Sequence, residues 1–381
     1  MMMEQVEKNM GRILLMFMIW LAPGTLSMAQ TDAGITWWNP ATTKVQVIEG
    51  QGWAEGLENP YDRLPASDQE RVRPPVWNLS HHSAGLVIRF QSNASRIIVR
   101  YQVEGALNMN HMPSTGVSGV DLYVRNPDGE WLWAAGKFSF RDTIRYDFDG
   151  IITDPKIPEE GREYYLYLPL YNRVTWMEIG VPDGSKLKPL PVRSEKPIVA
   201  YGTSILQGGC ASRPGMAWSA LLGRMLDRPI INLGFSGNGR LEAPLIERMT
   251  EIDAAAYILD CLPNLSNRDI YSNKEVMDRL KAAVQQIRAV RPKTPIILVD
   301  HGGYPDGAII GVREIEYIQV NQSNYLAYYE LLDEGIIRLY RLAQDDIGLS
   351  INMTVDGTHP NDLGMVQYAR AYGKLLKKIL Q

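Results

Sequence analysis

The stretch Ile198-Val199-Ala200-Tyr201-Gly202-Thr203-Ser204 has the pattern of a short buried strand that ends in a glycine turn and a serine. Its first four residues are continuously apolar, as in strands that helices cover on both faces. From there to the end of the chain, short apolar runs alternate with helical patterns. This alternation predicts an α/β fold with a parallel sheet between two layers of helices.

The expected elements place several polar residues at one edge of that sheet. We expect strands at 198–201, 230–233, 254–259, 296–299 and 336–340, and helices at 216–226, 241–249, 274–290, 320–332 and 363–380. Ser204, Gly234 and Asn264 each follow an expected strand, and the segment 356–359 follows the fifth. Parallel sheets bind ligands at the carboxyl ends of their strands, so these residues should meet there.

The chain from Gly34 to Val181 has a different periodicity. Strand-like runs lie at 86–90, 96–103, 120–124, 131–133 and 164–168, separated by Gly, Pro, Asn and Asp. Short strands at such intervals are typical of an antiparallel sandwich. The turn 182–184 and the Pro-containing connector 186–191 close the pattern. We therefore predict an all-β sandwich domain over 30–190 and an α/β domain over 191–381.

The N-terminus has the pattern of a secretory signal peptide. Lys8 and Arg12 precede the apolar run 13–22, and Ser27-Met28-Ala29 matches a small-x-small cleavage site. We predict cleavage after Ala29 and a periplasmic or extracellular mature protein without stable membrane insertion. The run is short for a transmembrane span, and an uncleaved anchor remains the alternative.

Composition excludes several classes of function. The 381 residues include 39 basic and 43 acidic ones, a formal net charge of −4, which argues against a nucleic-acid or anionic-membrane partner. Cys210 and Cys261 are the only cysteines, which excludes a multi-cysteine zinc site. In an oxidising compartment the two could pair, or both could be buried free thiols.

Ser204, His359 and Asp356 are the residue types of a nucleophile, a base and the group that orients the base. Asp356 lies three residues before His359, within reach of its ring. Simpler roles exist for each: Ser204 could cap a helix, and Asp356 with Pro360 could begin one. Asn264 could supply an amide donor to an oxyanion or could stabilise a turn.

Other motifs give weaker signals. The glycine-rich stretch 234–239 lacks the last glycine of a G-x-S-x-G elbow and the lysine of a phosphate loop, so it favours a tight turn that presents backbone N–H groups. His111 lies in a Met/Asn loop that could approach the site. His301 ends the fourth expected strand and is the alternative base. His81 and His82 are expected to be surface or packing residues.

Taken together, these motifs resemble the SGNH/GDSL hydrolases. Gly202-Thr203-Ser204-Ile205, Gly234, Asn264 and Asp356-x-x-His359 follow the order and rough spacing of that family's four blocks. The segment 119–123 (Gly-Val-Asp-Leu-Tyr) resembles the signature of the subfamily with an N-terminal GxDLY domain. Thr203 stands where the family has an aspartate, which leaves the hydrogen bonding of this loop open.

The resemblance implies a flavodoxin-like, three-layer SGNH hydrolase domain preceded by the sandwich. It also implies that Ser204 attacks an acyl carbonyl, that His359 takes the serine proton and that Asp356 holds the imidazole. The N–H groups of Ser204 and Gly234 and the amide of Asn264 would then form the oxyanion hole. It implies no metal and no organic cofactor.

The predicted function is that of a secreted serine esterase, specifically a carbohydrate O-acetyl (short acyl) esterase. Its partner would be an acylated carbohydrate or another small ester. Export and the aromatic-rich β domain favour a carbohydrate. Two alternatives stay open: a lipid or lysophospholipid esterase, and a glycan-binding protein with an inactive hydrolase fold.

Overall fold

The computed structural model describes residues 32–126, 128–152 and 157–380. The predicted signal peptide and its cleavage site, at 1–29, lie outside these residues. Among the helices that the structure describes, none combines the length and the apolarity that a membrane span requires.

Five strands form the sheet of the C-terminal half. They are β12 (Ile198–Gly202), β13 (Ile230–Gly234), β14 (Ala256–Asp260), β15 (Ile296–Val299) and β16 (Leu339–Leu342). Neighbouring strands are parallel, and their order is β13-β12-β14-β15-β16. This is the expected flavodoxin-like order, in which ligands bind where the strand order reverses, between the first and third strands of the sheet in chain order.

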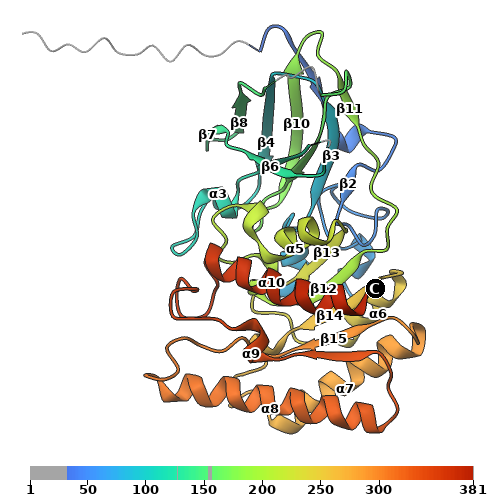
Figure 1. Ribbon diagram of the computed structural model, residues 1–381, viewed down its shortest axis with the longest axis vertical. Helices are drawn as coiled ribbons and strands as arrows, with labels where there is room; N and C mark the ends of the chain where they lie inside the picture. The colour runs from blue at the N-terminus through green and yellow to red at the C-terminus, as the bar shows by residue number, and fades with distance from the viewer. Residues whose placement is uncertain (1–31, 127, 153–156, 381) are drawn as a thin grey trace, which may run out of the picture. The chain divides into compact units, whose positions relative to one another are not determined.

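Helices pack on both faces of this sheet. They are α4 (Ser204–Gln207), α5 (Trp218–Leu226), α6 (Ala243–Glu251), α7 (Asn273–Val290), α8 (Gly311–Asp333), α9 (Gln344–Ile347) and α10 (Asp362–Ile379), with the short 3₁₀ turns η3 (Pro214–Met216) and η4 (Leu262–Asn264). Val199 and Tyr201 of β12 pack with α6, α7 and α8, whereas Ile198 and Ala200 pack with α5 and α10. Figure 1 shows α7 beside α8, away from the α5–α10 pair. Both faces of β12 are therefore apolar, as its sequence predicts.

The N-terminal half is an antiparallel β-sandwich, as expected. Its strands are β1 (Ile35–Trp38), β2 (Ile48–Glu49), β3 (Val87–Ser92), β4 (Arg96–Val103), β5 (Asp121–Arg125), β6 (Trp131–Ala134), β7 (Lys137–Ser139), β8 (Ile144–Asp149), β9 (Arg162–Tyr167), β10 (Val174–Pro182) and β11 (Leu187–Pro189). One sheet has the order β1-β10-β4-β8-β7 and the other β11-β3-β9-β5-β6, with β2 beside β3. Inward side chains such as Ile88, Val99 and Leu166 form one core between them. The short helices are η1 (Pro40–Thr42), η2 (Ala66–Asp68), α2 (Pro74–Ser80) and α3 (Ser114–Val117).

Some element boundaries differ from the expected ones. Helix α8 begins at Gly311, earlier than the expected start at residue 320. Its first turns expose apolar residues such as Val312 and Ile315, and these residues hide the amphipathic period in the sequence. Strand β16 begins at Leu339, because Arg338 has a left-handed backbone (φ 52°) just before it. Helix α10 begins at Asp362 with Asn361 as its N-cap, so Asp356 does not begin a helix.

The sandwich and the parallel sheet belong to one compact unit, residues 36–381. Arg63 precedes the first long sandwich strands, yet its buried guanidinium donates to the carbonyl oxygens of Asn232 at 3.0 Å and Gly234 at 2.8 Å. The Arg63 side chain thus holds the end of β13 in place through these two hydrogen bonds. The domain boundary at residue 190 stays a prediction, based on the change from a β pattern to an alternating β/α pattern in the sequence.

Candidate active site

Ser204 is the first residue of α4, directly after β12, and is 7% exposed. Its Oγ lies 2.9 Å from Nε2 of His359. The hydroxyl of Thr203 accepts a hydrogen bond from the N–H of Ile205 at 3.3 Å and so caps the helix. Threonine therefore supplies the cap that an aspartate could supply at the same position.

The segment 356–359 orients the histidine ring. Asp356 Oδ2 lies 2.7 Å from Nδ1 of His359, while Oδ1 accepts from the backbone N–H groups of Thr358 at 3.0 Å and His359 at 2.7 Å. Gly357, with φ +78°, lets the chain fold back so tightly. Partial burial raises the pKa of the Asp356 carboxyl, but the hydrogen bonds from His359 and Thr358 outweigh it and lower the pKa below its usual value. An ionised Asp356 places the ring proton on Nδ1 and leaves Nε2 to accept from Ser204.

Neighbouring elements hold this loop from two sides. Arg313 of α8 donates to the carbonyl oxygen of Gly357 at 2.7 Å and to the hydroxyl of Thr358 at 3.0 Å. The backbone N–H of Cys210, in the loop after α4, donates to the carbonyl oxygen of Pro360 at 3.0 Å. The segments that follow Ser204 and His359 are thus joined directly.

Gly234 has a packing role in the structure. Its N–H donates to Oδ1 of Asn232 at 2.9 Å in a buried position. A Cβ on Gly234 would stand 2.3 Å from the backbone nitrogen of Gln207, so only glycine lets α4 approach β13 this closely. Because the N–H is already engaged, we do not retain the expected oxyanion role of Gly234.

Three other N–H groups at this edge have no acceptor within the described parts of the chain: the backbone N–H of Ser204, that of Gly237 and the side-chain amide of Asn264. Oδ1 of Asn264 accepts a hydrogen bond from the N–H of Gly239 at 3.0 Å. The NH₂ group of the same side chain therefore remains available to donate to another acceptor. Gly237 lies exposed in the turn closed by the bond from Asn238 N–H to Phe235 O at 2.8 Å. Sequence reasoning missed Gly237, although the turn-forming stretch 234–239 contains it.

Gln207 of α4 fixes that turn. Its Oε1 accepts from the N–H of Ser236 at 2.9 Å, and its Nε2 lies 2.9 Å from Nδ1 of His82. Burial, with Arg63 and His81 nearby, lowers the pKa of His82 to about 4, so this ring is neutral and accepts from Gln207. His82 is thus a packing residue, as expected, but one that supports the turn through Gln207.

The loop that carries His111 does approach the site, since the rings of His111 and His359 lie 5.7 Å apart. His301, the alternative base, is buried, and its Nδ1 accepts from the N–H of Gly303 at 3.0 Å. Burial, with Arg313 nearby, lowers the pKa of His301 to about 3. The ring beside Ser204 is that of His359.

Both cysteines are buried free thiols, so the structure contains no disulfide between Cys210 and Cys261. Burial, with Asp356 nearby, raises the pKa of the Cys210 thiol to about 12. Two residue sets in the described chain bring three potential metal-ligand atoms within 4.8 Å of one another: His111, Cys210 and His359, and Glu58, Asp62 and His81.

Comparisons with known proteins match both halves of the chain. A model described as the GDSL-like lipase/acylhydrolase family matches residues 195–377, and one described as the N-terminus of SGNH-hydrolase-type esterases matches residues 35–187. A Bacteroides ovatus protein assigned as a GDSL-like lipase has a crystal structure that is 33% identical, with a TM-score of 0.81 over 91% of this chain and 98% of that one. The chain belongs to the GDSL-like lipase/acylhydrolase family. It is therefore an esterase of the serine hydrolase type.

More distant solved structures share the fold of this esterase. A salicylyl acyltransferase from a tetracycline biosynthetic pathway is 18% identical, with a TM-score of 0.69 over 92% of this chain and 96% of that one. A family two carbohydrate esterase from Cellvibrio japonicus is 12% identical, with a TM-score of 0.55 over 91% and 98%. Among curated proteins, none matches the chain.

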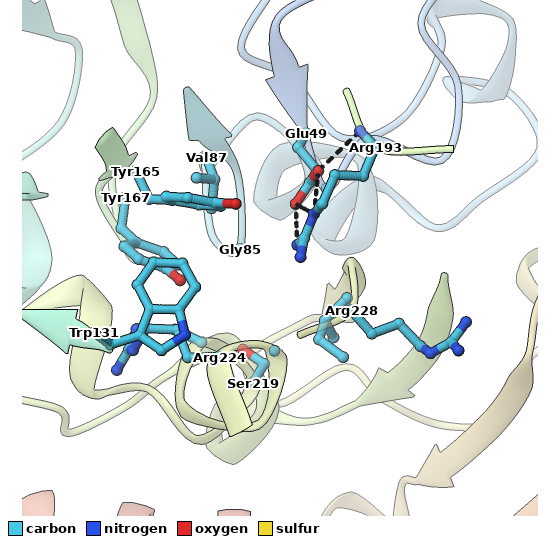
Figure 2. A pocket seen from close by; sticks show the side chains of 14 residues that line it. Glu49, Gly85, Val87, Trp131, Tyr165, Tyr167, Arg193, Ser219, Arg224 and Arg228 are labelled. Atoms are coloured by element: carbon cyan, nitrogen blue, oxygen red, sulfur yellow. Dashed lines mark hydrogen bonds and ion pairs between the residues drawn. The ribbon is translucent and has the colours of Figure 1, made fainter. Parts of the chain in front are cut away.

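The pocket in Figure 2 is lined by none of Ser204, His359 and Asp356. It lies between sandwich strands and α5, and none of its lining residues belongs to the segments that hold Ser204 and His359. Arg193 is paired there with Glu49, whereas Nη1 of Arg224 and the hydroxyl of Tyr165 are buried without a partner in the described chain. A cavity of about 30 Å³ suits one or two waters that would satisfy them, not an ester substrate.

Proposed function

We propose that the protein hydrolyses short acyl esters of carbohydrates through an acyl-enzyme on Ser204. The observation that carries the proposal is the hydrogen-bonded series from Ser204 Oγ to His359 Nε2, at 2.9 Å, and from His359 Nδ1 to Asp356, at 2.7 Å. A nucleophile within hydrogen-bond reach of a base, which a third group orients, is the arrangement that acyl transfer requires.

In the first half-reaction, Ser204 Oγ attacks the acyl carbonyl carbon while Nε2 of His359 takes its proton. Asp356 stabilises the resulting imidazolium through Nδ1–H. The tetrahedral intermediate collapses, the sugar hydroxyl leaves with the proton from His359, and the acyl group stays on Ser204. In the second half, His359 deprotonates water, which attacks the acyl carbon and releases the carboxylic acid and the free serine.

The developing oxyanion needs donors that are not already engaged. We assign this role to the N–H groups of Ser204 and Gly237 and to the side-chain amide of Asn264. The bonds to Oδ1 of Asn264 and from Ser236 to Gln207 fix these donors before substrate arrives. Preorganised donors need no reorientation during the reaction, which is the main source of their effect.

A hollow beside the nucleophile loop supports a carbohydrate as the alcohol part of the ester. Trp133 and Phe138 line it, each about half exposed, and so do Ser212 and Arg213 of the loop after α4. Its volume is about 250 Å³. Half-exposed aromatic side chains beside polar ones suit sugar rings, which have apolar faces and hydroxyl edges.

Two further observations favour this substrate class. The Cellvibrio japonicus carbohydrate esterase and an acetyl xylan esterase from Butyrivibrio proteoclasticus share the fold. The predicted signal peptide would bring the enzyme to extracellular or periplasmic glycans. A partner of this class agrees with the near-balanced charge of the chain.

A substrate panel tests the proposal. Nitrophenyl acetate should be cleaved faster than nitrophenyl octanoate, and acetylated xylo-oligosaccharides should release acetate. Trp133→Ala should lower kcat/KM on the acetylated oligosaccharide more than on nitrophenyl acetate, and the matched control Tyr329→Ala, which removes an exposed aromatic ring from α8, should change neither. Faster octanoate cleavage would instead indicate a lipid esterase, and glycan binding without hydrolysis would contradict the enzymatic mechanism.

A further inference from the structure

Three potential soft-metal ligands converge beside the catalytic serine from three separate segments. His111 comes from a sandwich loop, Cys210 from the loop after α4, and His359 from the segment before α10. One ligand atom of each lies within 4.8 Å of the other two. Imidazole nitrogen and thiolate sulfur are the donors that Zn²⁺ prefers in proteins.

His359 already has the arrangement of a zinc-bound histidine. Metal-ligating histidines donate their second ring N–H to a carboxylate, which fixes the tautomer. Nδ1 of His359 lies 2.7 Å from Asp356, so Nε2 carries the free lone pair. Among the residues that the structure describes, the partner of Nε2 is the hydroxyl of Ser204, which a metal ion would displace.

Cys210 is held in place beside this ring. It is 5% exposed, and its backbone N–H is bonded to Pro360, the residue after His359. Its thiol has no hydrogen-bond partner within the described residues, whereas the thiol of Cys261 donates to the carbonyl oxygen of Tyr201 at 3.5 Å. Of the two cysteines, Cys210 is therefore the one whose sulfur is free to bind.

The distances require only a small closure. Zn–N bonds of about 2.0–2.1 Å and a Zn–S bond of about 2.3 Å put tetrahedral ligand atoms about 3.3–3.6 Å apart. Starting from separations of at most 4.8 Å, the three atoms must approach one another by no more than about 1.5 Å. His111 can supply this movement, because its side chain is exposed in the loop closed by the Met109–Met112 bridge.

We propose that His111, Cys210 and His359 form a Zn²⁺ site that inhibits the esterase reversibly. Zn²⁺ would form bonds to one nitrogen of each imidazole and to the sulfur of Cys210, whose proton leaves to solvent. Water completes the tetrahedron. The hydrogen bond from Ser204 to His359 is lost, so Ser204 no longer has a base to take its proton. This inhibitory effect rests on the proposed function, whereas the binding of the metal does not.

The other set, Glu58, Asp62 and His81, is already neutralised. Both oxygens of Asp62 accept from Arg173, at 3.0 and 2.8 Å, and Oδ2 also lies 3.0 Å from His81. A cation there would have to displace the guanidinium. This set therefore supplies a matched control for the first one.

Calorimetry and cobalt spectroscopy on the full chain test the binding. Zn²⁺ should bind with one equivalent per chain, and Co²⁺ should give a thiolate-to-cobalt charge-transfer absorption in the near ultraviolet. His111→Ala and Cys210→Ser should each weaken Zn²⁺ binding by at least about tenfold, since even residues that only support a metal ligand contribute that much. The absorption should vanish in Cys210→Ser, whereas His81→Ala and Cys261→Ser should behave as the parent protein.

Inhibition is measured with nitrophenyl acetate at a series of Zn²⁺ concentrations. We expect loss of activity that a chelator restores, a half-inhibition concentration at least about tenfold higher in His111→Ala, and no inhibition by Mg²⁺ or Ca²⁺, which prefer oxygen ligands. Equal Zn²⁺ affinity in the parent and His111→Ala, or a cobalt complex without thiolate absorption, overturns the site. Tight binding that leaves hydrolysis unchanged overturns the inhibition. If the parent protein cleaves no ester, the binding measurements still show whether the zinc site exists. If Cys210→Ser does not fold, His111→Ala still tests the site, because His111 is exposed.

Discussion

Asp121, the aspartate of the Gly-Val-Asp-Leu-Tyr signature, holds the loop that follows Ser204 and α4. Its carboxylate is 3% exposed and accepts from Nε1 of Trp133 at 2.5 Å, from Nη1 of Arg213 at 2.5 Å and from the N–H of Gly215 at 3.0 Å. Arg213 and Gly215 lie in the loop that follows Cys210 and leads into α5. Replacing Asp121 with alanine should therefore weaken the attachment of this loop to the sandwich.

The magnitude follows from burial. Removing one partner of a buried ion pair costs about 3–5 kcal/mol, because the other charge stays buried and unpaired. The side chain of Arg213 is 24% exposed, so water solvates part of it, and we expect the lower end of that range, about 3 kcal/mol. A change of about 3 kcal/mol lowers the ratio of folded to unfolded protein by a factor of more than about 100.

Urea unfolding followed by circular dichroism measures this loss in Asp121→Ala. The matched control is Asp253→Ala, which removes an exposed partner of Lys196 and should change the unfolding free energy by less than about 1 kcal/mol. In urea-free buffer, Asp121→Ala should also lower kcat on nitrophenyl acetate, since the loop is adjacent to Ser204. A loss in Asp121→Ala no larger than that in the control would refute the reasoning that this carboxylate joins the two halves.

Three further outcomes are expected. Asn264→Ala should lower kcat on nitrophenyl acetate by about 100–1000-fold with little change in KM, as for one oxyanion donor; an unchanged kcat would remove Asn264 from the site. Asp356→Ala should lower kcat less than His359→Ala, because a misoriented base retains part of its function, and stopped-flow rates that rank them the other way would contradict the assigned roles. Burial raises the pKa of Asp260 to about 6, against a hydrogen bond from Tyr372 that lowers it. A carboxyl with a raised folded pKa stabilises the fold below its unfolded pKa, near 4, and loses that stabilisation as pH rises through about 6. In the parent protein the unfolding free energy should fall between pH 4 and pH 8, and Asp260→Asn should remove up to about 3 kcal/mol of that fall. Urea titrations at both pH values measure the difference. An equally steep pH dependence in the variant would exclude Asp260 as the source of the fall.

The parallel sheet was predictable from the sequence because its strands are mostly apolar, and β12 and β15 are apolar throughout. Ile198 to Tyr201 must be covered on both faces, and the structure covers them with two separate helix layers. The spacing of Asp356 and His359 also predicts their contact, since the interaction is local and needs only the left-handed Gly357 between them.

The proposed oxyanion donors were harder to predict. Whether a glycine N–H is free to donate depends on contacts that the local pattern does not specify. The N–H of Gly234 donates to the side chain of Asn232, and α4 packs against Gly234. The roles of Asp121 and His111 likewise require the sandwich to lie beside the sheet, which no pattern within either segment specifies.

The central claim is that Ser204 carries the acyl group during turnover. Peptide mapping by mass spectrometry after treatment with a fluorophosphonate tests it directly, because such reagents phosphonylate an activated serine irreversibly. We predict one label per chain, on the peptide that contains Ser204, formed in proportion to the loss of esterase activity and nearly absent in His359→Ala. A label on another residue, or full loss of activity with Ser204 unmodified, would contradict the account.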